Sequence, residues 1–329
     1  MGYLSTTGQQ QKEETMPDIE LINYETKDKW LAARESTLGA SESAAILGLA
    51  PDGRESEFSL WAKKTGLVPV EELDGEWLEL GQILEGPIAD LYARRTRNVL
   101  WAPPSSFCVA VHPRFPFLTA TVDRWIIEAT GHEDRGDLEI KNVGAFNSDW
   151  RDGKDISLPL YVQAQVQHQL AVTGFGWAVV AALIGGNSLK TIEVARNQEF
   201  IDELEAKAVE FWDRVQRKEA PAIDGSVASN NAVKVLHMDD SGETVDLDED
   251  TRSLADGWEE AKEDEKTAKA HALEADNKLR AMLGKATFGK LPDGRIVSLK
   301  TTERKGYTSV VEPTKFRTLK IIEPKGKKT

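Results

Sequence analysis

The chain has 329 residues, 40% of them hydrophobic and 29% charged, and a formal net charge of −14 at pH 7. No apolar run approaches the about 20 residues that span a bilayer, and the polar segment Met1–Met16 lacks the apolar centre of a signal peptide. Cys108 is the only cysteine, which excludes an intrachain disulfide and a cysteine-ligated zinc or iron–sulfur site built from this chain alone. We therefore expect a cytoplasmic globular protein without membrane contact.

The charge is unevenly distributed along the chain. Leu236–Asp276 holds 15 acidic and four basic residues, whereas Lys285–Thr329 holds 12 basic and four acidic residues. Contacts with DNA phosphates are local, and they are screened within about 10 Å at moderate salt. An acidic overall composition is therefore compatible with DNA binding through a local basic surface.

The N-terminal part of the chain begins with residues 1–18, which predict a flexible arm. A helix is predicted over Ile19–Ala33. A turn at Gly39 and an N-cap at Ser41 then predict a short helix over Glu42–Leu47.

Arg34 and Ser41 precede or begin this short helix. Free backbone N–H groups, a hydroxyl and a guanidinium together form a good seat for a phosphate. The alternative is a plain N-capped helix beside an exposed arginine, and these residues alone favour it because serine is a standard N-cap.

Two further helices are predicted in the first half. Phe58–Thr65 is short, with Trp61 buried, and Glu76–Arg97 is strongly amphipathic. Pro87 should kink or divide the second helix. Glu85 lies just before this break; a solvated glutamate is the default interpretation, and a carboxylate directed into a cleft is the alternative. The apolar positions of the second helix are Trp77, Leu80, Leu84, Ile88 and Leu91.

Three strands follow and predict an antiparallel meander: Ser106–Val111, Phe117–Ile127 and Gly136–Val143. The third strand carries residues around which we expect the chain to be organised. Because strand side chains alternate between faces, Glu139 and Lys141 share one face, opposite to the face that packs into the core.

Asp123 lies at the end of an apolar run in the second of these strands. Carboxylates on neighbouring strands, here Asp123 and Glu139, can hold a hard cation such as Mg²⁺ through oxygen ligands. Lys141 can orient a water or neutralise charge as a phosphodiester is attacked. A surface ion pair and turn chemistry are the alternatives, and so short a motif has a high false-positive risk.

Leu160–Thr173 predicts a helix with two contrasting faces. Val162, Val166 and Leu170 form an apolar stripe. The other face carries hydrogen-bonding groups, which are Tyr161, Gln165, His168 and Gln169. We interpret His168 alone as structural, whereas a polar face beside the acids could hold water or substrate.

A buried strand over Trp177–Ile184, its hairpin partner over Leu189–Val194 and a long helix over Gln198–Arg217 follow. Pro221 and Gly225 end the first domain, which we place at residues 19–225.

Residues 226–329 form a predicted C-terminal appendage. It begins with a polar linker over 226–245 and continues as a long exposed helix over Asp246–Leu283, in which we find no sustained heptad and hence no coiled coil. A small β-hairpin unit over Gly284–Ile322 and a basic tail over Lys325–Thr329 follow. This pattern is equally compatible with two interpretations. One is a segment that contacts DNA or a partner, and the other is a solubilising helix with a mobile tail.

The order of these features resembles the YqaJ-like viral recombinase family, which includes lambda-type alkaline exonuclease and belongs to the PD-(D/E)xK nuclease superfamily. The resemblance covers roughly Trp30–Pro221. It departs from the superfamily pattern at Val122, where proline is expected, and Thr121 stands where some relatives carry serine. The matching stretches are Arg34–Gly48, Leu80–Glu85, Thr121–Asp123, Leu138–Lys141 and Tyr161–His168.

The resemblance implies an α/β (α+β) fold with a mixed central β-sheet flanked by helices. It implies that Asp123 and Glu139 ligate Mg²⁺, with Glu85 and the Ile140 carbonyl completing the site, and that Lys141 positions or activates the attacking water. The resemblance gives supporting or end-binding roles to further residues: Gln165 supports the site, Arg34 and Ser41 bind a DNA 5′-phosphate, and Thr121, Tyr161 and His168 are additional candidates for support.

The function that the resemblance implies is a Mg²⁺-dependent exonuclease, with Mn²⁺ as an alternative metal, that digests double-stranded DNA from 5′ ends in phage-type recombination. Its partners would be DNA ends, a single-strand annealing protein and further copies of the chain in a ring, in the bacterial host cytoplasm. The rival interpretations are an endonuclease of the same fold and a non-catalytic DNA-binding recombination accessory protein.

Overall fold

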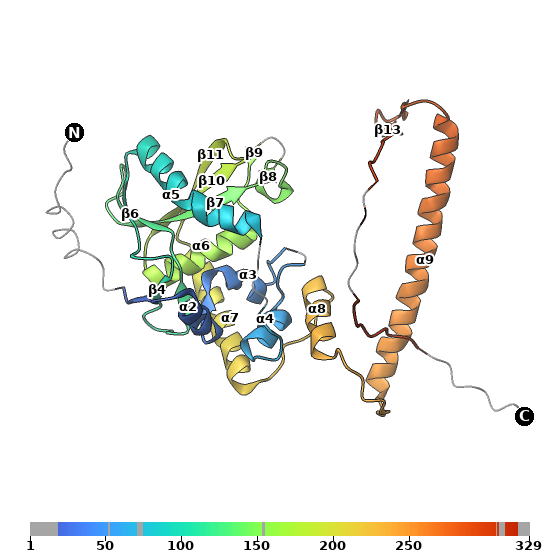
Figure 1. The fold of residues 1–329 in the computed structure, drawn as a ribbon, viewed down its shortest axis with the longest axis horizontal. Helices are drawn as coiled ribbons and strands as arrows, with labels where there is room; N and C mark the ends of the chain where they lie inside the picture. The colour runs from blue at the N-terminus through green and yellow to red at the C-terminus, as the bar shows by residue number, and fades with distance from the viewer. Residues whose placement is uncertain are drawn as a thin grey trace, which may run out of the picture. The chain divides into compact units, whose positions relative to one another are not determined.

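The computed structural model describes residues 19–51, 53–70, 75–152, 155–306, 308 and 313–321. The predicted arm over 1–18 and the basic tail over Lys325–Thr329 lie outside these residues. The chain forms two compact units, Met1–Leu236 and His237–Thr329, each of which is described by itself (Figure 1).

The first unit is built around a five-stranded mixed sheet, as predicted, with the order β11-β10-β7-β6-β3. β7 and β10 are parallel, and the other neighbouring strands are antiparallel. The strands are β3 Val99–Trp101, β6 Arg124–Glu128, β7 Gly136–Val143, β10 Trp177–Ile184 and β11 Ser188–Ala195.

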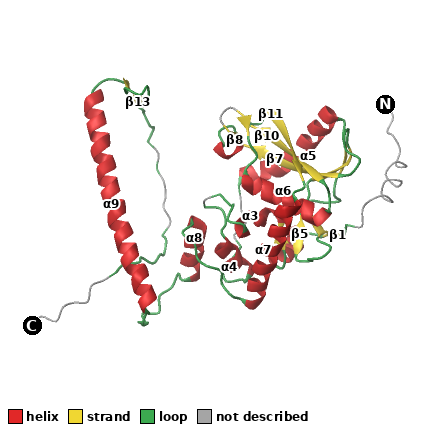
Figure 2. Ribbon diagram, turned by 180° about the vertical axis from the view of Figure 1, so that it is seen from behind, coloured by secondary structure: helices red, strands yellow, loops and turns green. Residues whose placement is uncertain are grey.

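Helices pack on both faces of this sheet (Figure 2). The helix α5, Glu76–Thr96, covers the face that carries Leu138 and Ile140 of β7. The helix α6, Leu160–Thr173, packs through its apolar residues against the opposite face. Because β7 and β10 are covered on both faces, they are buried almost along their whole length, and β7 can present polar side chains to the interior.

A second sheet of four strands contains β1 Leu21–Asn23, β2 Leu38–Gly39, β4 Cys108–Val111 and β5 Leu118–Ala120, in the order β1-β4-β5-β2. The predicted single strand Phe117–Ile127 is therefore wrong: its two halves, β5 and β6, belong to different sheets. The predicted meander is wrong for the same reason. Asp123 lies in the connection between the halves, where the chain passes from one sheet to the other.

The predicted helix Ile19–Ala33 is also corrected. Residues 21–23 pair with β4, and the helix α2, Lys27–Glu35, begins only after Thr26, whose side chain accepts a hydrogen bond from the Lys29 backbone N–H. The short helical segments that follow are η1 Ala40–Glu42 and α3 Ser43–Ile46. Ser41 is not the predicted N-cap; Gly39 occupies that position, and its N–H donates to the Glu42 carboxylate at 2.8 Å.

Two predicted helices of the first half are confirmed, with one difference. The helix α4, Glu57–Lys64, buries Trp61. The helix α5 is assigned without interruption through Pro87, so the proline does not divide it. Only the half of α5 after the proline is buried, and the predicted stripe fails before it, since Trp77 and Leu80 are exposed.

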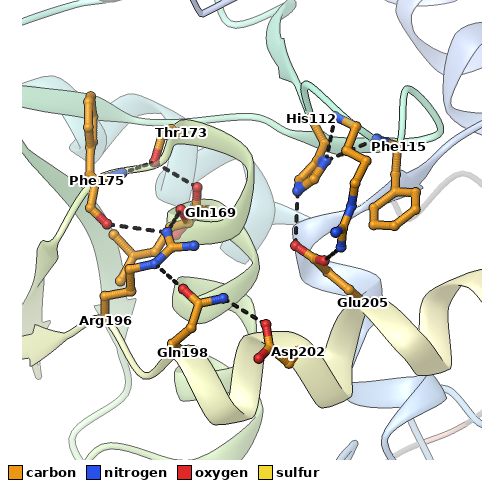
Figure 3. Close-up of polar contacts among 11 residues, drawn as sticks. His112, Phe115, Gln169, Thr173, Phe175, Arg196, Gln198, Asp202 and Glu205 are labelled. Atoms are coloured by element: carbon orange, nitrogen blue, oxygen red, sulfur yellow. Dashed lines mark hydrogen bonds and ion pairs between the residues drawn. The ribbon is translucent and has the colours of Figure 1, made fainter.

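Polar contacts hold the C-terminal end of α6 in place (Figure 3). The Arg196 guanidinium donates to the carbonyl oxygens of Leu170 and Phe175, and the Arg196 Nε donates to Gln198 at the start of α7, Gln198–Arg217. The Glu205 side chain of α7 contacts His112 (Figure 3) and Arg114, which lie in the turn between β4 and β5. These contacts join the C-terminal end of α6 to the segment between β11 and α7, and α7 to the turn after β4.

The first unit ends later than predicted. The helix α8, Val227–Leu236, packs on α4, and the buried hydroxyls of Ser229 and Ser56 lie 2.8 Å apart. The predicted polar linker over 226–245 is therefore wrong for its first half. Two short strands, β8 Arg151–Asp152 and β9 Asp155–Ile156, and the turn η2 Ser148–Trp150 lie between β7 and α6.

The second unit contains the predicted long helix and hairpin. The helix α9, Glu249–Leu283, has no buried residue, and β12 Phe288–Lys290 pairs with β13 Ile296–Ser298. Within the described ranges of the whole chain, no helix combines the length and apolar character that crossing a membrane requires.

Candidate active site

Glu139 is the centre of the candidate site. It lies on β7 and is only 3% exposed. Gln165 and Gln169 of α6 donate to its two carboxylate oxygens at 2.7 and 2.6 Å, and the Lys141 ammonium lies 2.5 Å from Oε1. The polar face of α6 therefore meets the Glu139 face of β7, and three donors hold one carboxylate in a fixed orientation.

Lys141 lies beside Glu139 and also donates to Gln165 Oε1 at 3.1 Å. Burial by itself lowers the pKa of Lys141, but the negative charges of Glu139 and Asp123 outweigh this effect, so that its pKa lies above the ordinary value. The lysine therefore remains protonated near neutral pH and acts as a positive, orienting group rather than as a free-amine base.

Asp123 reaches β7 from the connection between β5 and β6. Its Oδ2 accepts a hydrogen bond from the Ile140 backbone N–H at 2.7 Å. Burial, followed by the charges of Glu139 and Glu85, raises the pKa of Asp123 well above the ordinary value, although Lys141 opposes the rise. Its carboxylate charge is therefore poorly compensated by the protein.

Glu85 extends from α5 toward the same region. Its carboxylate forms an ion pair of 2.6 Å with Arg124, which also donates to the Asp123 carbonyl. Glu85 is thus close enough to raise the pKa of Asp123 but is engaged by a cation of the protein itself. In the part of the chain that the structure describes, no group of three or more His, Cys, Asp or Glu side chains is arranged as a metal site.

The donor chemistry nevertheless fits a divalent cation at Asp123 and Glu139. Both offer carboxylate oxygens, the ligands that Mg²⁺ prefers. Asp123 is buried beside the negative charges of Glu139 and Glu85, and the positive charge of a cation would offset them. Glu85 can join this pair only after it separates from Arg124, and the predicted role of the Ile140 carbonyl stays a prediction.

Asp137 is a site neighbour that the sequence analysis missed. It is 1% exposed, and neither of its carboxylate oxygens has a hydrogen-bond partner among the described residues. Burial, followed by the charge of Glu139, raises its pKa well above the ordinary value. The period-two alternation that pairs Glu139 with Lys141 also places Asp137 on their face, and it could have revealed this residue.

Asp137→Asn is expected to reduce the loss of stability that follows as the pH rises above the ordinary pKa of an aspartate. A carboxyl with a raised folded pKa stabilises the protein fully below its unfolded value, and this contribution is lost as the pH rises through the folded pKa, by up to about 1.4 kcal/mol per pH unit. Urea unfolding at about pH 5 and about pH 8 with chelator measures the effect. Equal pH slopes for wild type and variant would contradict it, since the contributions of other groups cancel in the comparison.

Arg34 and Ser41 form a second polar site. The Arg34 Nη2 lies 3.5 Å from Ser41 Oγ and 3.7 Å from Glu42 Oε1, and the guanidinium is 4.9 Å from the centre of the Trp30 ring. These contacts extend the arginine over a small pocket. The pocket is lined by Tyr24, Trp30, Ala33, Arg34, Thr37, Gly39, Val109, Thr119 and Thr121.

Lys64 supports the pocket from α4. It is largely buried, which lowers its pKa, and it donates to the carbonyls of Arg34 and Thr37 at 2.6 and 2.7 Å and pairs with Glu42 at 2.9 Å. Sequence reasoning did not single out this residue, because a lysine late in a short helix carries no local signal.

The three remaining predicted residues have different surroundings. His168 is fully buried, and its Nδ1 lies 2.6 Å from the Ser43 hydroxyl; burial lowers its pKa to about 3, so it is a neutral residue that joins α6 to α3. The Thr121 carbonyl accepts a hydrogen bond from Gln169 at 3.4 Å. The Tyr161 ring lies 5.0 Å from the Arg54 guanidinium.

Comparison with known proteins gives one family and several related folds. Residues 29–176 match the model of the YqaJ-like viral recombinase domain. The Bacillus subtilis (strain 168) protein named "Uncharacterized protein YqaJ" is 31% identical over 269 residues, which make up 80% of this chain and 80% of that protein. The matched domain includes both sites described above, from Arg34 to Gln169.

Two solved structures are also similar. The alkaline exonuclease LHK-Exo from Laribacter hongkongensis has a TM-score of 0.44 and 18% identity, covering 59% of this chain and 94% of that one. A phage-related exonuclease from Haemophilus somnus 129PT has a TM-score of 0.38 and 12% identity, covering 56% and 96%.

Proposed function

Because this chain belongs to the YqaJ-like viral recombinase family, we propose that it is a divalent-metal-dependent exonuclease that digests double-stranded DNA from 5′ ends during recombination. The observation that carries the proposal is that Asp123, Glu139 and Lys141 lie together in one partly buried region at β7. In a plain surface ion pair, we would not expect the poorly compensated Asp123 carboxylate beside Glu139, whose carboxylate is already oriented by three donors.

The residues of the site have different roles in phosphodiester hydrolysis. Asp123 and Glu139 would hold Mg²⁺ or Mn²⁺, which supplies Lewis-acid charge and lowers the pKa of bound water. Lys141 keeps its proton on Nζ and places positive charge where the phosphate becomes more negative. Gln165 and Gln169 keep the Glu139 oxygens in one orientation.

The Arg34 pocket supports a preference for 5′-phosphate ends. Arg34 and Ser41 provide a guanidinium and a hydroxyl, and Thr121 lies both in this pocket and two residues before Asp123. A DNA end in the pocket would therefore contact Thr121, and the chain reaches the Asp123 carboxylate two residues later. A ring of several copies and a single-strand annealing partner remain proposals of the same kind.

Arg34→Ala is expected to slow release from 5′-phosphorylated ends about 10-fold or more, because a charge-assisted hydrogen bond contributes about 1.5–3 kcal/mol. Release from 5′-hydroxyl ends should change little. Initial rates on the two matched duplexes measure the ratio. Arg94→Ala is the control, because Arg94 donates to the Asp90 carbonyl of its own helix and lies outside both sites. An equal slowing on both ends would contradict the assignment.

The function is tested by nucleotide release from linear duplexes and closed circles, with Mg²⁺ or with chelator. Metal-dependent release from linear DNA only is the expected result. Cutting of closed circles would identify an endonuclease, and binding of DNA without release under either metal would favour the accessory role.

A further inference from the structure

The helix α9 is long and largely exposed among the described residues. It spans 35 residues and has no buried residue. No described residue of the second unit, His237–Thr329, is fully buried, although Trp258 and Leu283 are half-buried. Large apolar side chains are nevertheless present on α9: Leu254 is 74% exposed and Met282 is 82% exposed. A helix with such residues is normally covered along one face.

Large apolar residues do not sustain a heptad along α9, but the a and d spacing can be followed through the helix when alanines are counted as apolar. Starting at Thr251, the a and d positions follow one another at alternating steps of three and four residues, and eight of these ten positions are apolar. The large residues occupy its two ends and the alanines its middle. The apolar set is Leu254, Trp258, Ala261, Ala268, Ala272, Ala275, Leu279 and Met282.

The charges of α9 differ between its halves. Residues 249–265 contain eight acidic and two basic residues, whereas residues 266–283 contain four basic and two acidic residues. Several of these residues form ion pairs within the helix, such as Lys278 with Glu274. Parallel pairing with an identical helix would place the two acidic halves together. Antiparallel pairing would place each acidic half beside a basic half.

The apolar sizes also match in the antiparallel arrangement. When the helix is paired with itself about its centre, an a position faces a d position in every layer. Leu254 then faces Leu279, and the large Trp258 faces the small Ala275. Ala261 faces Ala272, which permits close approach of the two backbones.

The central layer is polar. Glu265 occupies an a position there and binds Lys262 and Lys269 of its own helix at 2.8 and 2.5 Å. Two copies would bring two such clusters together. Glu265 faces Ala268 of the partner, so this layer occurs twice, and a polar residue at a single a position commonly fixes the register of a coiled coil at some cost in stability.

From the exposed heptad and the opposite charges of its halves, we propose that α9 pairs with the α9 of a second copy of this chain in an antiparallel two-stranded coiled coil. The pairing is independent of the proposed nuclease activity, because α9 contains no residue of either site. Nuclease rates and association are therefore measured separately.

Leu254→Glu/Leu279→Glu tests the pairing in the full chain. Each pair of helices contains this leucine layer twice, so the variant introduces four charges into the seam. We expect light scattering after size exclusion to show half the particle mass of the wild type. Leu273→Glu is the matched control, because Leu273 is 61% exposed on the same helix but lies outside the heptad seam. An unchanged mass for the double variant would overturn the proposal.

Cysteine cross-linking tests the direction without disturbing the charge. A mixture of Leu254→Cys and Leu279→Cys chains should form a disulfide-linked dimer when treated with a thiol oxidant, whereas each variant alone should not. Wild-type protein with its buried Cys108 is the background control. Cross-linking of Leu254→Cys chains to one another would indicate a parallel pair, and no cross-linking in the mixture would indicate that α9 covers something else; either result overturns the proposal.

Discussion

Asp123→Asn is expected to lower nucleotide release from linear duplex DNA on the order of 10³-fold or more, while the metal-free protein becomes more resistant to heat. The amide can still accept the hydrogen bond from the Ile140 backbone N–H. It no longer carries the charge that burial, Glu139 and Glu85 disfavour. Loss of activity with a gain in stability is the pattern expected where a protein keeps a costly charge for function.

Thermal unfolding with chelator and with Mg²⁺ measures both parts of this prediction. Mg²⁺ should raise the midpoint of the wild type but not that of Asp123→Asn, because a ligand stabilises only the state that binds it. Asp213→Asn is the control, since Asp213 is an exposed residue of α7 paired with Arg217. A variant that retains both its activity and its response to Mg²⁺ would exclude Asp123 from the metal site.

Lys141→Met is expected to lower activity by about 10²–10³-fold and also to destabilise the fold by about 3 kcal/mol. The loss of stability follows because the buried Glu139 loses its positive partner while two amide donors remain. Removing one member of a buried pair leaves a charge that the interior solvates poorly. Urea unfolding and initial rates measure the two effects.

The double variant Glu139→Gln/Lys141→Met separates the two roles of the lysine. It should recover most of the lost stability, because the buried charge is gone and the Gln169 amide can turn its unpaired Oε1 toward the new donor. It should not recover activity. Lys207→Met is the matched control, because Lys207 is half exposed and pairs with Glu210 on the surface. A double variant as unstable as Lys141→Met would show that packing, and not charge, explains the loss.

Features of the fold that depend on local contacts were predictable from the sequence, whereas features that depend on distant segments were not. The alternation of β7 and the face of α6 are periodic features of the sequence, so the meeting of Glu139 with Gln165 was predictable once the two elements were placed side by side. The break between β5 and β6 was not, because Phe117–Ile127 is continuously strand-like and only the packing of two sheets divides it. The ion pair of Glu85 with Arg124 joins elements far apart in the chain and has no local signal.

The sequence by itself determined the helices with strong apolar periodicity, the buried strand β10, the exposed character of α9 and the residue types of the site. These follow from side-chain size, charge and spacing, which act over a few residues. The tertiary structure alone decided that Asp123 binds the backbone of β7, that Glu139 and Asp137 lose contact with water, and that α8 belongs to the first unit. Burial and its effect on pKa depend on which distant segments cover a group, and no local pattern specifies that.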